Sequence, residues 1–220
     1  MKISGTIHSA AAIVLLMLVT SGAFAQESHV AILLNSVNSR LNYGSSINHS
    51  LQGYKKDLRG FQAGLSWQKG LTKNFSIVTE AYYVKKGGTL KAGNPLNGVK
   101  STLKLYSVEV PVLARLHVNR FYFNAGPYVN YIAGGKSMSD IEESHPISFG
   151  SGGFRRWEAG LQGGAGYQFK IKRSKLAVDV RYTHGLTSIS KVDNLYNRTI
   201  NVNIVVRRSF FNNKRNEFNP

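Results

Sequence analysis

Residues 156–171 read RWEAGLQGGAGYQFKI, and two kinds of side chain alternate along this stretch without interruption. The odd-numbered positions are apolar or small, from Trp157 through Leu161 to Ile171, whereas the even-numbered positions are polar or glycine. A strict period of two is typical of a β-strand with one apolar and one polar face. Strands of soluble proteins usually span roughly three to ten residues, so a run of this length is unusual for a soluble fold.

The same alternation returns along the chain. Six further segments show it, the last two less cleanly: 106–118, 121–133, 176–183, 200–206, 61–67 and 75–83. The apolar run at 29–35 does not alternate, and we place a first strand there without defining its limits from the pattern. Together these segments predict eight strands.

The predicted connections alternate in length. The long ones span 36–59, 87–103, 134–154 and 187–198, and the short ones span 69–74, 119–120 and 172–174. Strict alternation of this kind is typical of an up-and-down barrel whose long loops all emerge at one rim. We therefore predict an all-β fold, an eight-stranded antiparallel up-and-down transmembrane β-barrel. The expected location is the outer membrane of a Gram-negative bacterium, with both termini in the periplasm.

The first 25 residues carry the three parts of a secretory signal peptide. Lys2 supplies the positive charge, an apolar run spans 10–19, and Ala23-Phe24-Ala25 provides a cleavage motif. The apolar run is too short to span a membrane as a helix, which needs about 20 residues. The expected organisation is a signal peptide at 1–25, an outer-membrane β-barrel domain at 26–211 and a polar periplasmic tail at 212–220.

The chain is strongly basic and contains no cysteine. Its 220 residues include 28 Lys and Arg against 11 Asp and Glu, a formal net charge of +17. Without cysteine, disulfide bonds and thiol chemistry are excluded. In a cytosolic protein this charge would suggest nucleic acid, but an exported protein meets other anions. We therefore expect outer-membrane lipid, including anionic headgroups, and envelope or secretion-machinery proteins as partners, with no nucleic acid and no cofactor.

The polar strand faces bring charges of both signs into the predicted lumen. Eight strands enclose a space that side chains can fill, and buried charges must be paired and hydrogen-bonded. We predict a ladder of ion pairs made of Glu80, Lys86, Glu109, Arg115, Arg156, Glu158, Asp179, Arg181 and Arg207. Gly160, Gly164 and Gly166 would leave room for the large side chains opposite. A proton or ion path along the same charges is the alternative.

Outward-facing aromatic residues gather at two heights. Those expected near the outer rim are Phe61, Tyr83, Tyr106, Tyr131, Trp157 and Tyr182. Those expected near the periplasmic rim are Trp67, Phe75, Phe121, Phe123, Tyr167, Phe169 and Phe210. Two aromatic girdles that flank an aliphatic band are typical of membrane barrels. The soluble alternative, a lipocalin-like barrel or β-sandwich, would turn its apolar faces inward and need no girdles.

Pro111 stands in the middle of a predicted strand, and proline cannot donate a ladder hydrogen bond. We expect a bulge or a local break in pairing there, close to Gly126-Pro127 of the next strand.

Three tracts resemble the PorT-like outer-membrane β-barrel family, which is typical of Bacteroidetes-type bacteria. They are YVKKG at 83–87, VEVPVL at 108–113 and NAGPYV at 124–129. The resemblance runs from about residue 29 to residue 210 and implies a barrel in the outer membrane. Because the founding member is an accessory of the type IX secretion pathway, the resemblance also suggests, more weakly, a link to protein secretion.

Outer-membrane barrels can be enzymes, and the best catalytic candidate is His184 with Thr187, Ser188 or Ser190. Such a site needs a nucleophile and base within hydrogen-bond reach and an orienting carboxylate. No Asp or Glu is obviously placed beside His184, and the His-x-Ser pattern of the deacylases is absent because residue 186 is leucine. We therefore expect no enzyme and no catalytic residue.

Charged clusters occur in the loops and at both rims. The acidic group at 140–145 has no EF-hand spacing, so we expect no metal site. Basic pairs at 55–56, 85–86 and 155–156 are expected near the outer rim, where they could meet lipid A phosphates. The expected function is that of a non-enzymatic interaction or assembly accessory of the cell envelope. The alternatives are a stand-alone structural barrel and a rim enzyme acting on lipid A.

Overall fold

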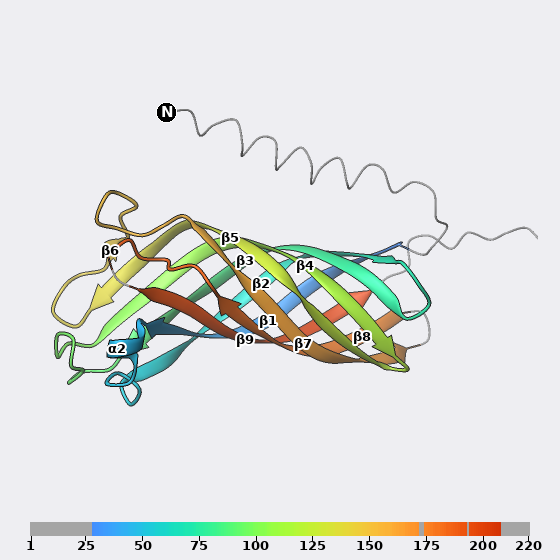
Figure 1. Ribbon diagram of the computed structural model, residues 1–220, viewed down its shortest axis with the longest axis horizontal. Coiled ribbons are helices and arrows are strands. Elements are labelled where there is room, and N and C mark those ends of the chain that lie inside the picture. Colours follow the sequence, from blue (N-terminus) through green and yellow to red (C-terminus); the bar gives the residue numbers. More distant parts are fainter. Residues whose placement is uncertain (1–27, 172–173, 193, 208–220) are drawn as a thin grey trace, which may run out of the picture.

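The computed structural model describes residues 28–171, 174–192 and 194–207 (Figure 1). The predicted signal peptide, the predicted tail and Phe210 lie outside these residues. In chain order the elements are β1 (Ser28–Tyr43), α2 (Ser45–Asn48), β2 (Lys55–Gly70), β3 (Phe75–Leu90), β4 (Ser101–Val118), β5 (Phe121–Ser139), β6 (His145–Pro146), β7 (Trp157–Ile171), β8 (Ser174–Gly185) and β9 (Leu195–Arg207).

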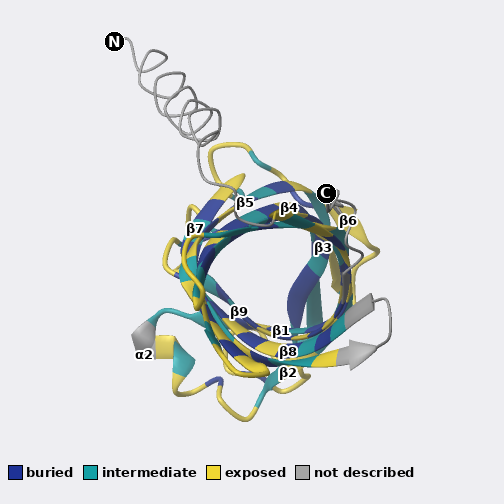
Figure 2. Cartoon of the chain, turned by 90° about the vertical axis from the view of Figure 1, so that its right-hand side faces the viewer, coloured by how far each residue is buried: buried dark blue, intermediate teal, exposed yellow. Residues whose placement is uncertain are grey.

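Eight long strands form a closed antiparallel barrel (Figure 2). Neighbours follow the order β4-β3-β2-β1-β9-β8-β7-β5, and β4 also pairs with β5, so the strands form a continuous ring in which the first strand, β1, pairs with the last, β9. β6 is a segment of two residues that pairs with the far end of β5. The predicted eight-stranded up-and-down barrel is therefore confirmed.

The connections fall into two groups at opposite ends of the barrel (Figure 1). One end carries residues 44–54, 91–100, 140–156 and 186–194, and we call it the loop end. The other end carries the short links between β2 and β3, β4 and β5, and β7 and β8, and we call it the turn end. The turn at Asn119-Arg120 is tight, with Asn119 at φ 56°.

The strands reach further toward the loop end than the sequence pattern predicts. β1 continues to Tyr43, so the predicted connection at 36–59 shrinks to 44–54. The other long connections shorten in the same way, because β3, β4, β5 and β9 all extend beyond their predicted limits. The sequence alternation ends before the strands do, because outward residues between the apolar band and the loop end, such as Asn38 and Asn42, are polar. An alternation of polar inward and apolar outward residues then no longer marks the strand.

β1 alternates in burial although its sequence does not alternate in polarity. Val30, Ile32 and Leu34 are exposed on the outside, whereas Ala31 and Leu33 are buried inside. The inward residues join an apolar cluster that includes Tyr82, Tyr122 and Val205 from other strands. The lumen is therefore apolar beside this part of β1, which explains the apolar run at 29–35.

The barrel accommodates Pro111 by a local break in pairing without a change of register. The β4–β5 ladder passes from Pro111↔Tyr128 to Ala114↔Ala125, and the β3–β4 ladder passes from Thr79↔Val112 to Tyr82↔Glu109. Of the two predicted outcomes, the break is the one observed. Register shifts occur elsewhere, between residues 57 and 62 on β2 and between residues 106 and 107 on β4.

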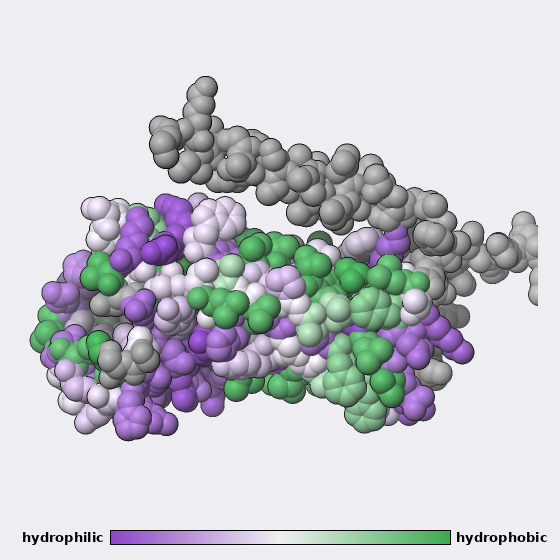
Figure 3. Space-filling model, in the orientation of Figure 1, coloured by the Kyte–Doolittle hydropathy of each residue, from purple (hydrophilic) through white to green (hydrophobic). Residues whose placement is uncertain are grey.

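On the face drawn in Figure 3, apolar side chains gather from the middle of the barrel toward the turn end, and hydrophilic side chains dominate the loop end. The exposed aliphatic residues of the band include Val180, Ile200 and Leu161. Within the described residues no helix is long and apolar enough to cross a membrane.

Candidate functional site

A central ion-pair cluster crosses the lumen from β8 to β3. Arg181 Nη1 and Nη2 donate to Glu80 Oε2 and Oε1 at 2.5 and 3.1 Å, and Nη2 also donates to Asp179 at 3.0 Å. Tyr122 Oη donates to Asp179 at 2.8 Å, and Asn203 donates to the other oxygen of the same carboxylate. Each charge in this cluster is thus buried with partners, which is the condition for holding charges in a barrel interior.

A second cluster lies around Lys86 of β3. Its Nζ is 3.0 Å from Glu109 Oε2 on β4 and 3.1 Å from Glu158 Oε2 on β7. Neutral groups complete the coordination: Tyr82 donates to Glu109, and Tyr128, Asn130 and Asn197 donate to Glu158. One ammonium group therefore bridges two strand walls, and side chains from five strands converge on it.

A third cluster surrounds Arg115 of β4. Its Nε donates to Asn124 at 2.7 Å and its Nη1 donates to Gln68 at 2.9 Å. The guanidinium group also stacks over the Tyr122 ring, 4.3 Å from the centroid. Because Tyr122 bonds to Asp179, this contact links the third cluster to the central one.

Seven of the nine residues predicted for the lumen are buried inside the barrel. Arg156 is not among them: it is exposed, precedes β7 and lies over the Phe149 ring at 3.9 Å. The alternation continues through Arg156 in the sequence, but strand pairing ends at Tyr131↔Trp157, so the side chain belongs to the loop. The side chain of Arg207 lies outside the described residues. Figure 2 shows that buried residues occur on strands all around the ring, interspersed with exposed ones.

The three predicted glycine positions lie against large side chains. A Cβ atom at Gly160 would be 2.6 Å from Tyr128, at Gly164 2.8 Å from Arg181, and at Gly166 2.3 Å from Tyr122. Sequence reasoning did not assign Tyr82, Tyr122 and Tyr128 to the polar network. The available signal was the alternation, which places Tyr122 and Tyr128 on the inward face of β5.

An apolar cluster lies at the loop end of the lumen. Leu41, Leu105, Ile132 and Leu195 of the strands pack there with Ile147 and Ile189 of two loops. Those loops are tied together: Arg155 N donates to Ile189 O at 2.8 Å, and Lys191 N donates to Gly153 O at 3.0 Å. The lumen is therefore covered at this end and crossed by ion pairs below it, an arrangement unlike an open aqueous channel.

The twelve described girdle residues all lie on outward strand faces. At the loop-end rim Tyr131 and Trp157 contact each other with ring centroids 5.0 Å apart. At the turn-end rim Tyr167 packs edge-on against both Phe121 and Phe169, at 5.0 and 4.8 Å. Aromatic residues of this kind mark the two membrane–water interfaces of a barrel.

The hydroxyl groups proposed as partners of His184 are used by the loop backbone. Thr187 Oγ1 accepts from Ala159 N at 2.9 Å, and Ser188 Oγ accepts from Leu195 N at 3.1 Å. The His184 ring instead faces Tyr182 on the outward side, with centroids 6.1 Å apart. The hydroxyl groups of Thr187 and Ser188 therefore stabilise the loop backbone.

The acidic loop cluster does not converge on a point. Asp140 Oδ1 lies 3.2 Å from Lys100 Nζ in an exposed ion pair. Among the described residues, no three His, Asp or Glu side chains are placed to hold a metal ion together.

Comparison with protein families matches residues 24–191 to the family described as outer membrane protein beta-barrel domain. No curated protein matches the chain. Among solved structures, the chain is similar to Ail, the attachment invasion locus protein of Yersinia pestis, whose structure was solved in complex with the heparin analogue sucrose octasulfate. The two sequences are 17% identical, the match covers 82% of this chain and 99% of that chain, and the TM-score is 0.41.

Two further structures are similar at low identity. Neisserial surface protein A has 14% identity, covers 82% of this chain and 97% of its own, and has a TM-score of 0.45. OprG from Pseudomonas aeruginosa has 14% identity, covers 84% of this chain and 95% of its own, and also has a TM-score of 0.45. The family match spans most of the chain, and with the closed barrel and its apolar band it shows that this chain belongs to the outer membrane protein beta-barrel domain family and resides in an outer membrane.

Proposed function

We propose that the protein is a non-enzymatic component of the outer membrane that binds other envelope proteins through its loop end. The observation that carries this proposal is the exposure of aliphatic side chains on all four long connections. They are Ile47, Leu96, Ile141, Leu186 and Val192. Ile141 and Val192 are 77% and 71% exposed, far above the packed residues of the same loops.

The filled lumen supports this proposal. A barrel that is crossed by ion pairs and covered by packed loops offers no wide path for solutes, so its functional surface is on the outside. Exposed apolar side chains that gather into one patch on a protein surface often mark a site that a partner covers. Protein partners commonly bury such groups at the centre of an interface.

The proposed orientation places the loop end outside the cell and the turn end in the periplasm, as in barrels with short periplasmic turns. The polar tail would then be available for periplasmic contacts. Protein secretion is the process that the PorT-like resemblance suggests, and proteins that co-purify with the barrel would identify the process.

The test is the native mass of the protein after extraction from the outer membrane in a mild detergent. We expect a complex several times heavier than one barrel. The double substitution Ile141→Asp and Val192→Asp should release the barrel from this complex. Leu71→Asp, which changes an exposed leucine at the turn end, is the matched control and should leave the complex intact.

A clean monomer for the unmodified protein would contradict the proposal and favour a stand-alone structural barrel. The proposed absence of catalysis has its own test. Lipid A from cells with and without the protein should have the same mass; a difference that disappears again in His184→Ala would show a rim enzyme.

A further inference from the structure

Two arginines occupy paired positions at the seam where the first barrel strand meets the last: Arg40 contacts Asp57 of β2, and Arg198 reaches the Gly185 carbonyl at the end of β8. In the antiparallel pairing of β1 with β9, Arg40 stands directly opposite Arg198, and both side chains are on the outward face. Like charges directly opposite each other in a sheet are destabilising. An anion held between the two guanidinium groups would remove this repulsion.

Further positive charges surround the pair. Lys55 Nζ donates to Asn42 Oδ1 at 3.3 Å, two residues beyond Arg40 on β1. Arg59 is exposed and pairs in register with Asn38 of β1. The carboxylate beside them is Asp57, which accepts from Arg40 Nε at 2.5 Å. Asp57 lies between Lys55 and Arg59 along β2 and contacts Arg40, so positive charges outnumber negative ones in this part of the barrel wall.

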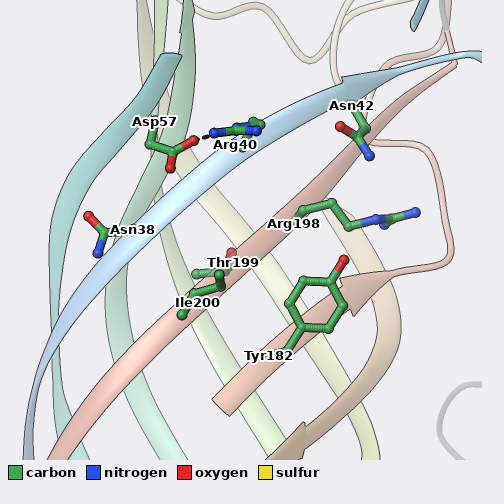
Figure 4. A pocket seen from close by; sticks show the side chains of 8 residues that line it. All are labelled: Asn38, Arg40, Asn42, Asp57, Tyr182, Arg198, Thr199 and Ile200. Atoms are coloured by element: carbon green, nitrogen blue, oxygen red, sulfur yellow. Dashed lines mark hydrogen bonds and ion pairs between the residues drawn. The ribbon is translucent and has the colours of Figure 1, made fainter. Parts of the chain in front are cut away.

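A hollow with a volume of about 250 Å³ lies over this seam (Figure 4). Its lining residues are Asn38, Arg40, Asn42, Asp57, Tyr182, Arg198, Thr199 and Ile200. Arg40 binds Asp57 through Nε, so its terminal nitrogens remain for a ligand. Arg198 Nη1 donates to the carbonyls of Gly185 and Asn197 at 2.5 and 3.1 Å, which fixes the guanidinium group at the hollow.

The hollow sits at the upper edge of the apolar band. Directly toward the turn end, Ile200 and Ile204 of β9 and Leu34 of β1 are exposed on the lipid-facing surface. Tyr182 of the loop-end aromatic girdle lines the hollow itself. Aromatic girdles lie at the level of lipid headgroups, so the group that reaches this hollow most readily belongs to a membrane lipid.

We propose that this hollow binds the phosphomonoester headgroup of an anionic lipid, clamped between Arg40 and Arg198. Arginine suits phosphate because its planar fork can donate two parallel hydrogen bonds. Asn42 and the Tyr182 hydroxyl supply further polar groups around the phosphate. The inference rests on the location of the barrel in an outer membrane and does not depend on a protein partner.

The test uses the full barrel in mild detergent and measures its affinity for diphosphoryl lipid A, for dephosphorylated lipid A and for phosphatidylglycerol. We expect the diphosphoryl lipid to bind tightest. The double substitution Arg40→Gln and Arg198→Gln should weaken its binding about tenfold or more, since charge-assisted hydrogen bonds are lost.

The matched control is Lys104→Gln with Lys136→Gln. These lysines also stand directly opposite each other, on β4 and β5, at the wall across from the β1–β9 seam (Figure 2). The control removes the same charge and the same like-charge contact outside the hollow. Equal loss of affinity in both double variants would show general attraction to a basic rim and would overturn the site.

Two further measurements separate the remaining outcomes. Inorganic phosphate should compete only weakly; strong competition would make free phosphate, and not a lipid, the ligand. Asp57→Asn keeps every cation and removes the one carboxylate that competes for Arg40, so it should bind the diphosphoryl lipid more tightly. Unchanged or weaker binding by a folded Asp57→Asn variant would contradict the clamp.

Discussion

Arg181 on β8 holds both carboxylate oxygens of Glu80 on β3, the strand four places away around the ring and thus on the opposite wall. The two residues are 101 positions apart in the sequence, so the pair exists only in the closed barrel. We expect Arg181→Met to lower the free energy of unfolding by about 3–5 kcal/mol, because the buried carboxylates of Glu80 and Asp179 would lose their positively charged partner. Urea unfolding in detergent micelles, followed by tryptophan fluorescence, measures the change.

The control for this substitution is Arg155→Met, which changes an exposed arginine in the loop. Surface positions of this kind usually alter stability by no more than about 0.5 kcal/mol. Similar urea midpoints for the two variants would mean that the lumen pair contributes little.

A second prediction concerns the two faces of β7. Leu161 is 53% exposed toward lipid, whereas Gln162 is buried and donates to Tyr82 Oη and Thr183 Oγ1. We expect Leu161→Arg to impair membrane assembly strongly, since a cation at the lipid-facing midplane costs about 2–4 kcal/mol. Gln162→Arg should be milder because lumen carboxylates can solvate it. Heat-modifiable migration on a gel reports assembly, and equal tolerance of both changes would contradict the assigned faces.

A third prediction uses two glycines of the same strand. A Cβ atom at Gly166 would lie 2.3 Å from Tyr122 and 2.5 Å from Asp179, whereas at Gly163 the nearest atom is 3.6 Å away. Gly166→Ala should therefore destabilise the barrel by about 1–3 kcal/mol through overpacking, and Gly163→Ala should be nearly neutral. Thermal unfolding of the two variants decides the point; a tolerated Gly166→Ala would mean that the lumen repacks easily.

A fourth prediction concerns the turn between β4 and β5. Asn119 has φ 56°, a left-handed conformation that costs an ordinary side chain roughly 1–2 kcal/mol. Asn119→Gly should preserve or raise the unfolding temperature, and Asn119→Val should lower it. If valine were accepted as well as glycine, the turn would have to change its conformation in the variant.

The middle of most strands could be predicted because lipid outside and ion pairs inside impose opposite polarities on alternate residues. β1 is the exception, since its inward Ala31 and Leu33 are as apolar as its outward residues. At the loop end this demand disappears, since both faces meet water or other protein. Asn38 and Arg40 were therefore predicted within a connection, although they belong to β1. The prediction for Arg156 was wrong at the same end of the barrel: its polarity fits the alternation, but β7 begins only at the next residue and the Arg156 side chain is exposed.

The seam hollow could not be predicted from the pattern. Arg40 and Arg198 both fell in predicted connections, and their direct opposition depends on the register between the first and last barrel strands. That register is set by closure of the whole ring. The set of charged residues inside the lumen could be predicted, but the partner of each charge could not. Alternation shows on which side of the sheet a residue lies and does not show which residue it meets across the barrel.

The ladder between β1 and β9 also determines when the barrel can close during folding. It extends from Ala31↔Arg207 to Tyr43↔Leu195, so the first strand finds its second neighbour only after the last strand has been delivered. Until then the sheet has two open edges, which are prone to pair with other chains. We therefore expect a chain that lacks β9 to aggregate through its open edges and not to form a smaller barrel.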